Sequence, residues 1–138
     1  MPTDDLWGEL PVPVPESEPD IAALPRTILQ EQASLLGSKT HNVLEGVVRK
    51  GDAGAHNNIG LDLFIRCSAL DNYSFHVLHL EHDILNAYPL KLDAIANQVG
   101  YDIDDVGALR NALTNIFQSP QVRRVVSALL REATTSVA

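Results

Sequence analysis

The sequence predicts an α+β domain in which helices cover one face of an antiparallel sheet. Segments 59–69 and 73–84 are rich in β-branched, aromatic and leucine residues, and they flank Asp71-Asn72, a dipeptide suited to a tight hairpin turn. Amphipathic segments precede and follow this hairpin, and a sheet with one leucine-rich face needs such a cover. We therefore expect a two-layer fold with three antiparallel strands, at 43–50, 59–69 and 73–84.

The turn at Asp71-Asn72 also predicts the pairing of the hairpin, if Leu70 faces Tyr73. One face of the hairpin then collects apolar side chains, and the other carries polar and aromatic ones. A slip of one residue would mix the two sets, so the pattern and the turn support each other. The expected pairs on the first face are Leu63–Leu80, Ile65–Leu78 and Cys67–His76, and those on the second are Asp62–Glu81, Phe64–His79, Arg66–Val77 and Ser68–Phe75.

Helices are expected on both sides of the sheet in the chain. Pro25 suits the first turn of a helix that Gly37 can end, and Ser119-Pro120 is a typical start of another. Apolar residues recur at helical spacing within each segment. The expected helices are 24–36, a short one at 94–99 that begins after Asp93, one at 103–118 with Asp102 and Asp105 at its start, and a last one from Pro120.

Residues 1–20 read as an acidic, proline-rich tail, and residues 21–138 as a single domain. The tail holds five prolines and six carboxylates without any Lys or Arg, and Pro11, Pro13 and Pro15 alternate with valine. Alternating prolines favour extended backbone and forbid helix. Trp7 stands among acids and leucines, so it could dock in an apolar groove on a partner or on its own domain. The alternative is a solubilising leader.

Composition narrows the function classes. Six of the 18 acidic residues lie in the tail, which leaves twelve acids against ten Lys and Arg in the domain, so no basic surface is expected for nucleic acid. The helix–strands–helix order resembles that of the double-stranded RNA-binding domain, but its lysine-rich helix start has no counterpart here. The lone Cys67 indicates a reducing cytoplasm, and neither a signal peptide nor a membrane-spanning segment is evident.

Two side-chain groups are candidates for chemistry. On the predicted register, Asp62 faces Glu81 with His79 nearby, and such a set can hold a divalent cation. The competing interpretation is that Arg49 neutralises the two carboxylates. Cys67 opposite His76 reads as part of the core. His76, His79 and His82 cannot share one site, because side chains alternate along a strand. We expect no cofactor.

These observations favour a non-enzymatic protein-interaction or accessory module that acts through the outer face of the sheet and the tail. Its partner would be another protein or a second copy of the chain. An alternative is a metal-dependent hydrolase that uses Asp62, His79 and Glu81, and a third is the sensing of a small ligand between sheet and helices. The expected partner-binding residues are Trp7, Phe64, Arg66, Phe75, Val77 and His79.

Overall fold

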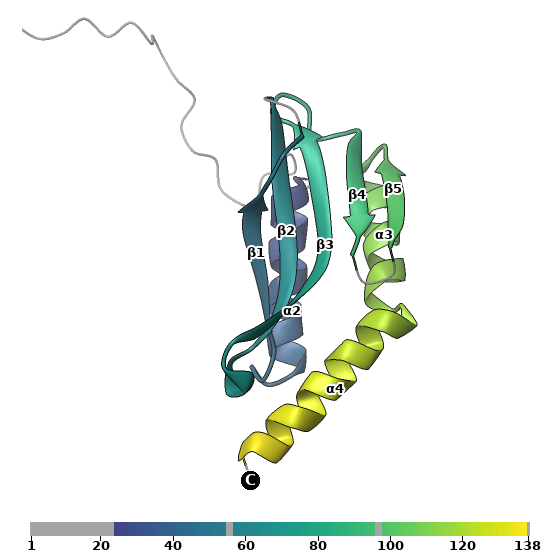
Figure 1. Ribbon diagram of the computed structural model, residues 1–138. Coiled ribbons are helices and arrows are strands. Elements are labelled where there is room, and N and C mark those ends of the chain that lie inside the picture. Colours follow the sequence, from purple (N-terminus) through teal and green to yellow (C-terminus); the bar gives the residue numbers. More distant parts are fainter. Residues whose placement is uncertain (1–23, 55–56, 96–97, 138) are drawn as a thin grey trace, which may run out of the picture.

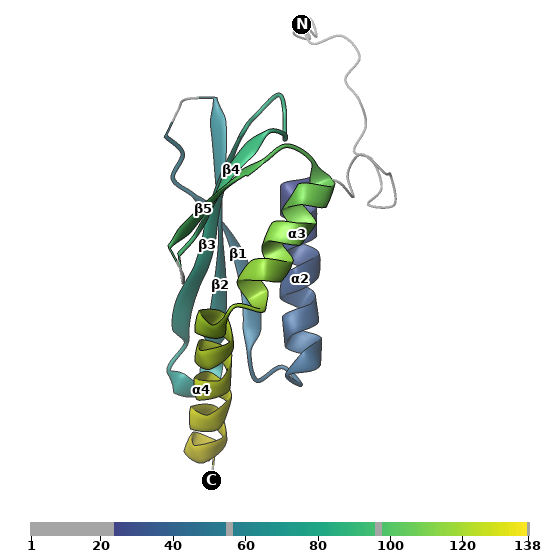
Figure 2. The ribbon, with the colours of Figure 1, turned by 90° about the vertical axis from the view of Figure 1, so that its right-hand side faces the viewer.

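The computed structural model describes residues 24–54, 57–95 and 98–137, and it confirms the α+β class (Figure 1). Within these ranges, one helix precedes an antiparallel sheet and two follow it. Figure 2 shows that the helices lie on the same side of the sheet. The elements are α2 (Pro25–Lys39), β1 (Glu45–Gly51), β2 (Asn58–Cys67), the 3-10 turn η1 (Ser68–Leu70), β3 (Tyr73–Asp83), β4 (Leu90–Ala94), β5 (Val99–Ile103), α3 (Val106–Phe117) and α4 (Pro120–Val137).

In the described residues the sheet has five strands in the order β1-β2-β3-β4-β5, so the prediction of three strands is wrong in this detail. The missed strands are β4 and β5, and β4 ends where a short helix at 94–99 was expected. Leu90, Leu92 and Ala94 are buried while Lys91 and Asp93 are exposed. That alternation is the period-two pattern of a strand with one buried face.

The hairpin of β2 and β3 is present, but its predicted register is wrong. Leu63 pairs with Leu78 rather than with Leu80, and Leu80 pairs with Leu61. The cause is η1, which takes residues 68–70 out of the ladder, so that the loop is longer than the two residues assumed. Next to the turn the register is shifted by three positions, and a β-bulge between Leu63 and Phe64 reduces the shift to two for Leu61 and Leu63, which leaves the leucines on their predicted face.

A β-bulge changes the faces nearer the turn. The ladder passes from Leu63–Leu78 directly to Phe64–His76, which leaves Val77 without an opposite residue. Val77 is 1% exposed in the core, and Phe75 packs partly buried against it. The prediction that Val77 and Phe75 lie on the outer face is therefore wrong. The predicted pairing of Cys67 with His76 is also wrong, because Cys67 lies opposite Tyr73.

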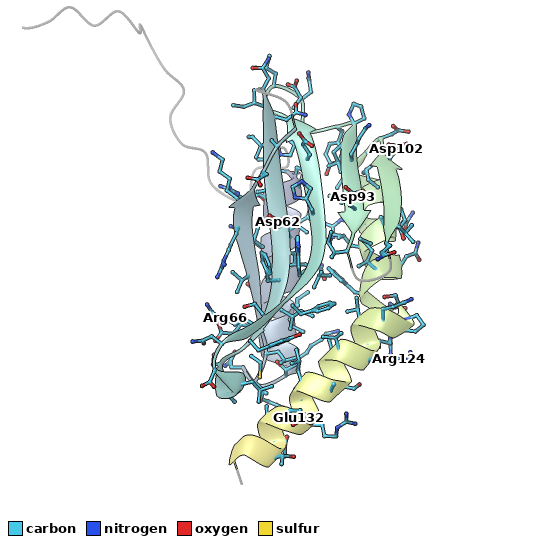
Figure 3. The ribbon with its side chains drawn as sticks, viewed as in Figure 1. Asp62, Arg66, Asp93, Asp102, Arg124 and Glu132 are labelled. Carbon is cyan, nitrogen blue, oxygen red and sulfur yellow. The ribbon has the colours of Figure 1, made fainter. Side chains whose placement is uncertain are left out.

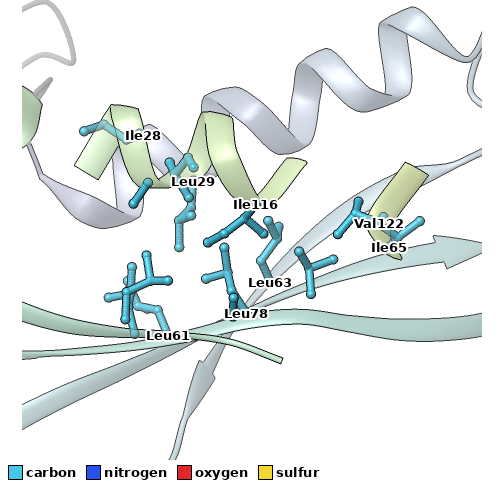
Figure 4. Packing of buried hydrophobic residues seen from close by; sticks show 14 of the residues in the cluster. Ile28, Leu29, Leu61, Leu63, Ile65, Leu78, Ile116 and Val122 are labelled. Atoms are coloured by element: carbon cyan, nitrogen blue, oxygen red, sulfur yellow. The ribbon is translucent and has the colours of Figure 1, made fainter. Parts of the chain in front are cut away.

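The hydrophobic core lies between the sheet and the helices (Figure 4). Side chains from all three helices meet the leucines of the central strands there, and burial of a large aliphatic side chain stabilises the fold by roughly 1.5–3 kcal/mol. The largest fully buried side chains include Ile28, Leu29, Leu44, Leu61, Leu78, Leu80, Leu92, Leu109 and Ile116.

The helix ends follow local signals. Ser119 Oγ accepts a hydrogen bond from the N–H of Val122 at 3.3 Å, which confirms the predicted cap of α4. The cap of α3 is Asp105, which accepts a hydrogen bond from the N–H of Ala108 at 2.8 Å, rather than Asp102 as the expected helix 103–118 required. α3 begins at Val106 rather than at 103, because Val99–Ile103 forms β5. None of the helices within the described ranges is both long enough and apolar enough to cross a membrane.

Candidate functional sites: the outer sheet face and the groove between α2 and α4

Asp62, in the middle of β2, is the centre of a polar cluster on the outer face of the sheet. Its Oδ1 atom accepts hydrogen bonds from His76 Nε2 at 2.9 Å and from His79 Nδ1 at 2.7 Å. The bulge at Val77 is what brings both imidazoles to the same face, although they stand three positions apart. The Asp62 side chain is 16% exposed, so this half-buried carboxylate fixes the orientation of two rings.

Phe64 lies beside this cluster on the same face. Its ring stacks on His76, with centroids 4.6 Å apart and an interplanar angle of 19°. The guanidinium of Arg49, in β1, stands over the same ring at 5.4 Å from its centroid. Phe64 is thus held by contacts with two neighbouring strands.

The predicted facing pair of Asp62 and Glu81 does not form. Asp62 lies opposite His79, and Glu81 lies opposite Gly60. The Glu81 carboxylate accepts hydrogen bonds from the N–H of Gly54 and from Asn58 Nδ2. Among the described residues, no group of three or more His, Cys, Asp and Glu side chains is placed to hold a metal ion.

An ion pair borders the outer face near the turn. Arg66 in β2 pairs with Glu45 in β1, its cross-strand neighbour. The hydrogen bond and the charge of Arg66 hold the pKa of Glu45 below its usual value of 4.5. Figure 3 shows Asp62 and Arg66 on β2, with Asp93 on β4 and Asp102 on β5. Charges of both signs are therefore spread over this face, several of them paired with each other.

The opposite side of the sheet carries an apolar groove between α2 and α4, with a volume of about 200 Å³. Leu63, Ile65 and Val77 contribute from the strands, and Leu35, 47% exposed, contributes from α2. The groove was not predicted from the sequence, because Val77 in its floor was expected on the outer face. The further lining residues include Gln32, Ala33, Leu36, Lys39, Gly46, Phe117, Val122 and Val126.

A second hollow, of about 750 Å³, runs between α2 and β1. One wall is the face of α2 that carries Thr27, Gln30 and Ser34, and the other is β1 with Gly46 and Val48. Because β1 is the first strand of the sheet, this hollow lies at the sheet edge. It is open and mostly polar, in contrast to the apolar groove.

The predicted partner-binding residues therefore divide between two surfaces. Phe64, Arg66 and His79 belong to the outer-facing side-chain set, as expected, whereas Val77 lines the groove on the helix side. Trp7 lies outside the described residues. No family model, no curated protein and no solved structure matches this chain.

Proposed function

We propose that this protein is a non-enzymatic interaction module that binds an apolar segment of a partner protein in the groove between α2 and α4. The observation that carries the proposal is the groove itself, a concave surface lined mainly by aliphatic and aromatic side chains at the meeting point of sheet and helices. Apolar concavities of this kind are the usual binding sites of proteins. The lone buried thiol of Cys67 suits a module of the reducing cytoplasm.

The size of the groove suits one or two anchoring side chains rather than a whole small molecule. Its volume of about 200 Å³ lies below the roughly 300–1,000 Å³ of small-molecule pockets. A large apolar side chain that enters it would gain about 1.5–3 kcal/mol, which is roughly a 10- to 150-fold gain in affinity. The groove therefore supports a helix-in-groove mode of recognition, with one dominant anchor.

A positive charge at the groove indicates the chemistry of the partner. Lys39, in the last turn of α2, is part of the lining. Among the described residues it is the only charged one that lines the groove, and a positive charge there is complemented by an acidic side chain of the occupant. We therefore propose an amphipathic helix whose polar side is acidic as the occupant.

The outer sheet face remains a proposed second contact surface, through Phe64, Arg66 and His79. Aromatic and arginine side chains that are already fixed before binding lose little entropy in a complex. The metal-dependent hydrolase is the less supported proposal, because Glu81 lies opposite Gly60 rather than Asp62 and accepts hydrogen bonds from Gly54 and Asn58, so the three expected ligands do not face one another. Calorimetric titration with Mn²⁺ or Zn²⁺ tests it directly.

A photo-crosslinking experiment tests the groove. The full chain carries benzoylphenylalanine at position 35 on the groove, or at position 85, where Leu85 is 86% exposed and does not belong to the groove lining. We expect position 35 to capture, in cells, a partner through an acidic amphipathic segment, and position 85 not to capture it. The captured segment is then synthesised and titrated against the protein.

The matched substitutions are Leu35→Asp and Leu85→Asp, which add the same charge at two exposed leucines. We expect Leu35→Asp to weaken binding of the synthesised segment at least about tenfold, as the loss of one anchor contact predicts, and Leu85→Asp to leave it unchanged. Crosslinks from position 35 only to residues 1–23 of the same chain, or only to a second copy, would overturn the proposed partner. If the two substitutions weakened binding equally, the groove would not be the binding site.

A further inference from the structure

We propose that residues 10–16 of this chain form an additional strand along the free edge of β1. In the described part of the chain, β1 is paired on one side only, with β2. The unpaired side of such a strand presents N–H and C=O groups that can accept another strand. This surface is distinct from the groove between α2 and α4, so the two proposals stand or fall separately.

The hollow beside β1 has the form that an added strand requires. Its walls are the edge of β1 and a stripe of α2 on which Thr27, Gln30 and Ser34 recur every three or four residues. Ala33, Ser34 and Gly46 are small, and they allow a neighbouring backbone to approach closely. A strand placed there would be paired by β1 and covered by α2.

Residues 10–16, Leu-Pro-Val-Pro-Val-Pro-Glu, have an alternation that matches an edge strand. A residue before proline is biased towards extended backbone, so Leu10, Val12 and Val14 are all favoured in strand geometry. Successive residues of a strand direct their N–H groups to opposite sides. The three prolines therefore remove N–H groups from one side alone and leave the other side complete.

Such a strand can pair with β1 through its complete side and accepts no further strand on its proline side. Proline within sheets is confined largely to positions of this kind, at the edge and with the missing donor facing solvent. The segment would thus complete the sheet and terminate it. A natural sheet protects its edges by the same means.

We infer that the added strand comes from the same chain, because a short link joins residues 10–16 to α2, which forms one wall of the hollow. Residue 16 is eight positions before Leu24, the residue that precedes α2, and α2 forms one wall of the hollow. Eight residues span up to about 26–29 Å when extended. The seven residues of β1 extend over about 23 Å, so the link can reach along the whole edge in either strand direction.

Amide hydrogen exchange of the full chain tests this inference with two matched double substitutions. Val12→Pro with Val14→Pro removes N–H groups from the side that would face β1. Pro11→Ala with Pro13→Ala changes the same number of residues but only adds N–H groups on the other side. We expect the first variant to lower protection of alternate β1 amides at least about tenfold, and the second to leave it within about twofold of the original.

Amides of β3 and β4 serve as internal controls, since they lie within the sheet and should not change in either variant. Unchanged β1 protection in the valine variant, or equal losses in both variants, would overturn the proposal. Exchange is repeated over a hundredfold range of protein concentration together with light scattering. Protection that appears only as a dimer forms would assign the strand to a second copy and contradict the intrachain proposal.

Discussion

Gly46 of β1 lies directly beneath Ala33 of α2. A Cβ atom built on Gly46 would overlap the Cα and Cβ atoms of Ala33, so a side chain at position 46 cannot be accommodated without moving the helix or the strand. This contact sets how closely α2 approaches the sheet, and α2 forms a wall of both the groove and the β1 hollow.

We therefore expect Gly46→Ala to destabilise the protein by about 1–3 kcal/mol, the usual cost of forcing extra volume into a packed contact. Gly100→Ala in β5 is the matched control, because its nearest neighbour, Asp93 Oδ1, is 3.4 Å from the added carbon. Denaturant unfolding measures both. A Gly46→Ala protein as stable as the original would show that α2 is free to shift.

Asp62→Ala removes the carboxylate that orients His76 and His79. Two hydrogen bonds are lost, but the two side chains are 34% and 23% exposed and can regain water. We expect a loss of about 1–2 kcal/mol in the free energy of unfolding. Asp93→Ala, an exposed carboxylate in β4 opposite His79, should cost under about 0.5 kcal/mol. Equal costs would mean that the imidazole bonds contribute little.

Val77→Ser distinguishes the bulged register from a regular ladder. Because Val77 is 1% exposed, its replacement by a smaller polar residue should cost roughly 2–4 kcal/mol. In a regular hairpin the residue would face outward and the change would be nearly neutral. Ser74→Ala, at an exposed position of the same strand, is the control and should leave the unfolding midpoint within error. A mild effect of Val77→Ser would contradict the bulge.

The Glu45–Arg66 ion pair predicts a dependence of stability on pH. Since the pKa of Glu45 is lower in the folded chain than its usual value of 4.5, the pair contributes stability above that pH and loses it as the pH falls below. The Glu45→Gln protein should therefore be less stable than the original at neutral pH, and the difference should shrink below 4.5. Unfolding curves at several pH values measure it. A difference independent of pH would assign the effect to packing.

The phenol of Tyr88 should ionise at a higher pH than that of an exposed tyrosine. Burial raises its pKa above the usual value of 10.0, because the charged phenolate loses more hydration on burial than the neutral phenol does. Its folded-state contribution is present below pH 10 and is lost as the pH rises through the raised pKa. Absorbance titration should show a late phase that disappears in Tyr88→Phe. A late phase that persists in this variant would belong to another group.

The sequence was sufficient for the class of the fold because the leucine alternation of the hairpin is strong. It was insufficient for β4, where the five residues Leu90–Ala94 are too few for periodicity to separate a strand from a helix. The predicted register was wrong for a different reason. Asp71 and Asn72 have positive φ in the observed loop, as they would in a two-residue hairpin turn, so the sequence does not distinguish the η1 turn from a tight loop.

The candidate sites were predictable only in part. Phe64 and His79 follow from strand alternation alone, but Val77 depends on the bulge, which breaks that alternation at one position. The groove depends on how far α4 lies from α2, and this distance is a property of tertiary packing. Stripes such as Val122 and Val126 show that a helix has an apolar face, but not how much of that face a neighbour covers.

The order of the sheet has a consequence for how the molecule assembles. Each of the five described strands lies beside its neighbour in the chain, so each of these pairings closes only a short stretch of backbone at a small cost in entropy. Folding can therefore proceed hairpin by hairpin without waiting for distant segments to meet, and topologies of this kind belong to the faster end of β-containing proteins.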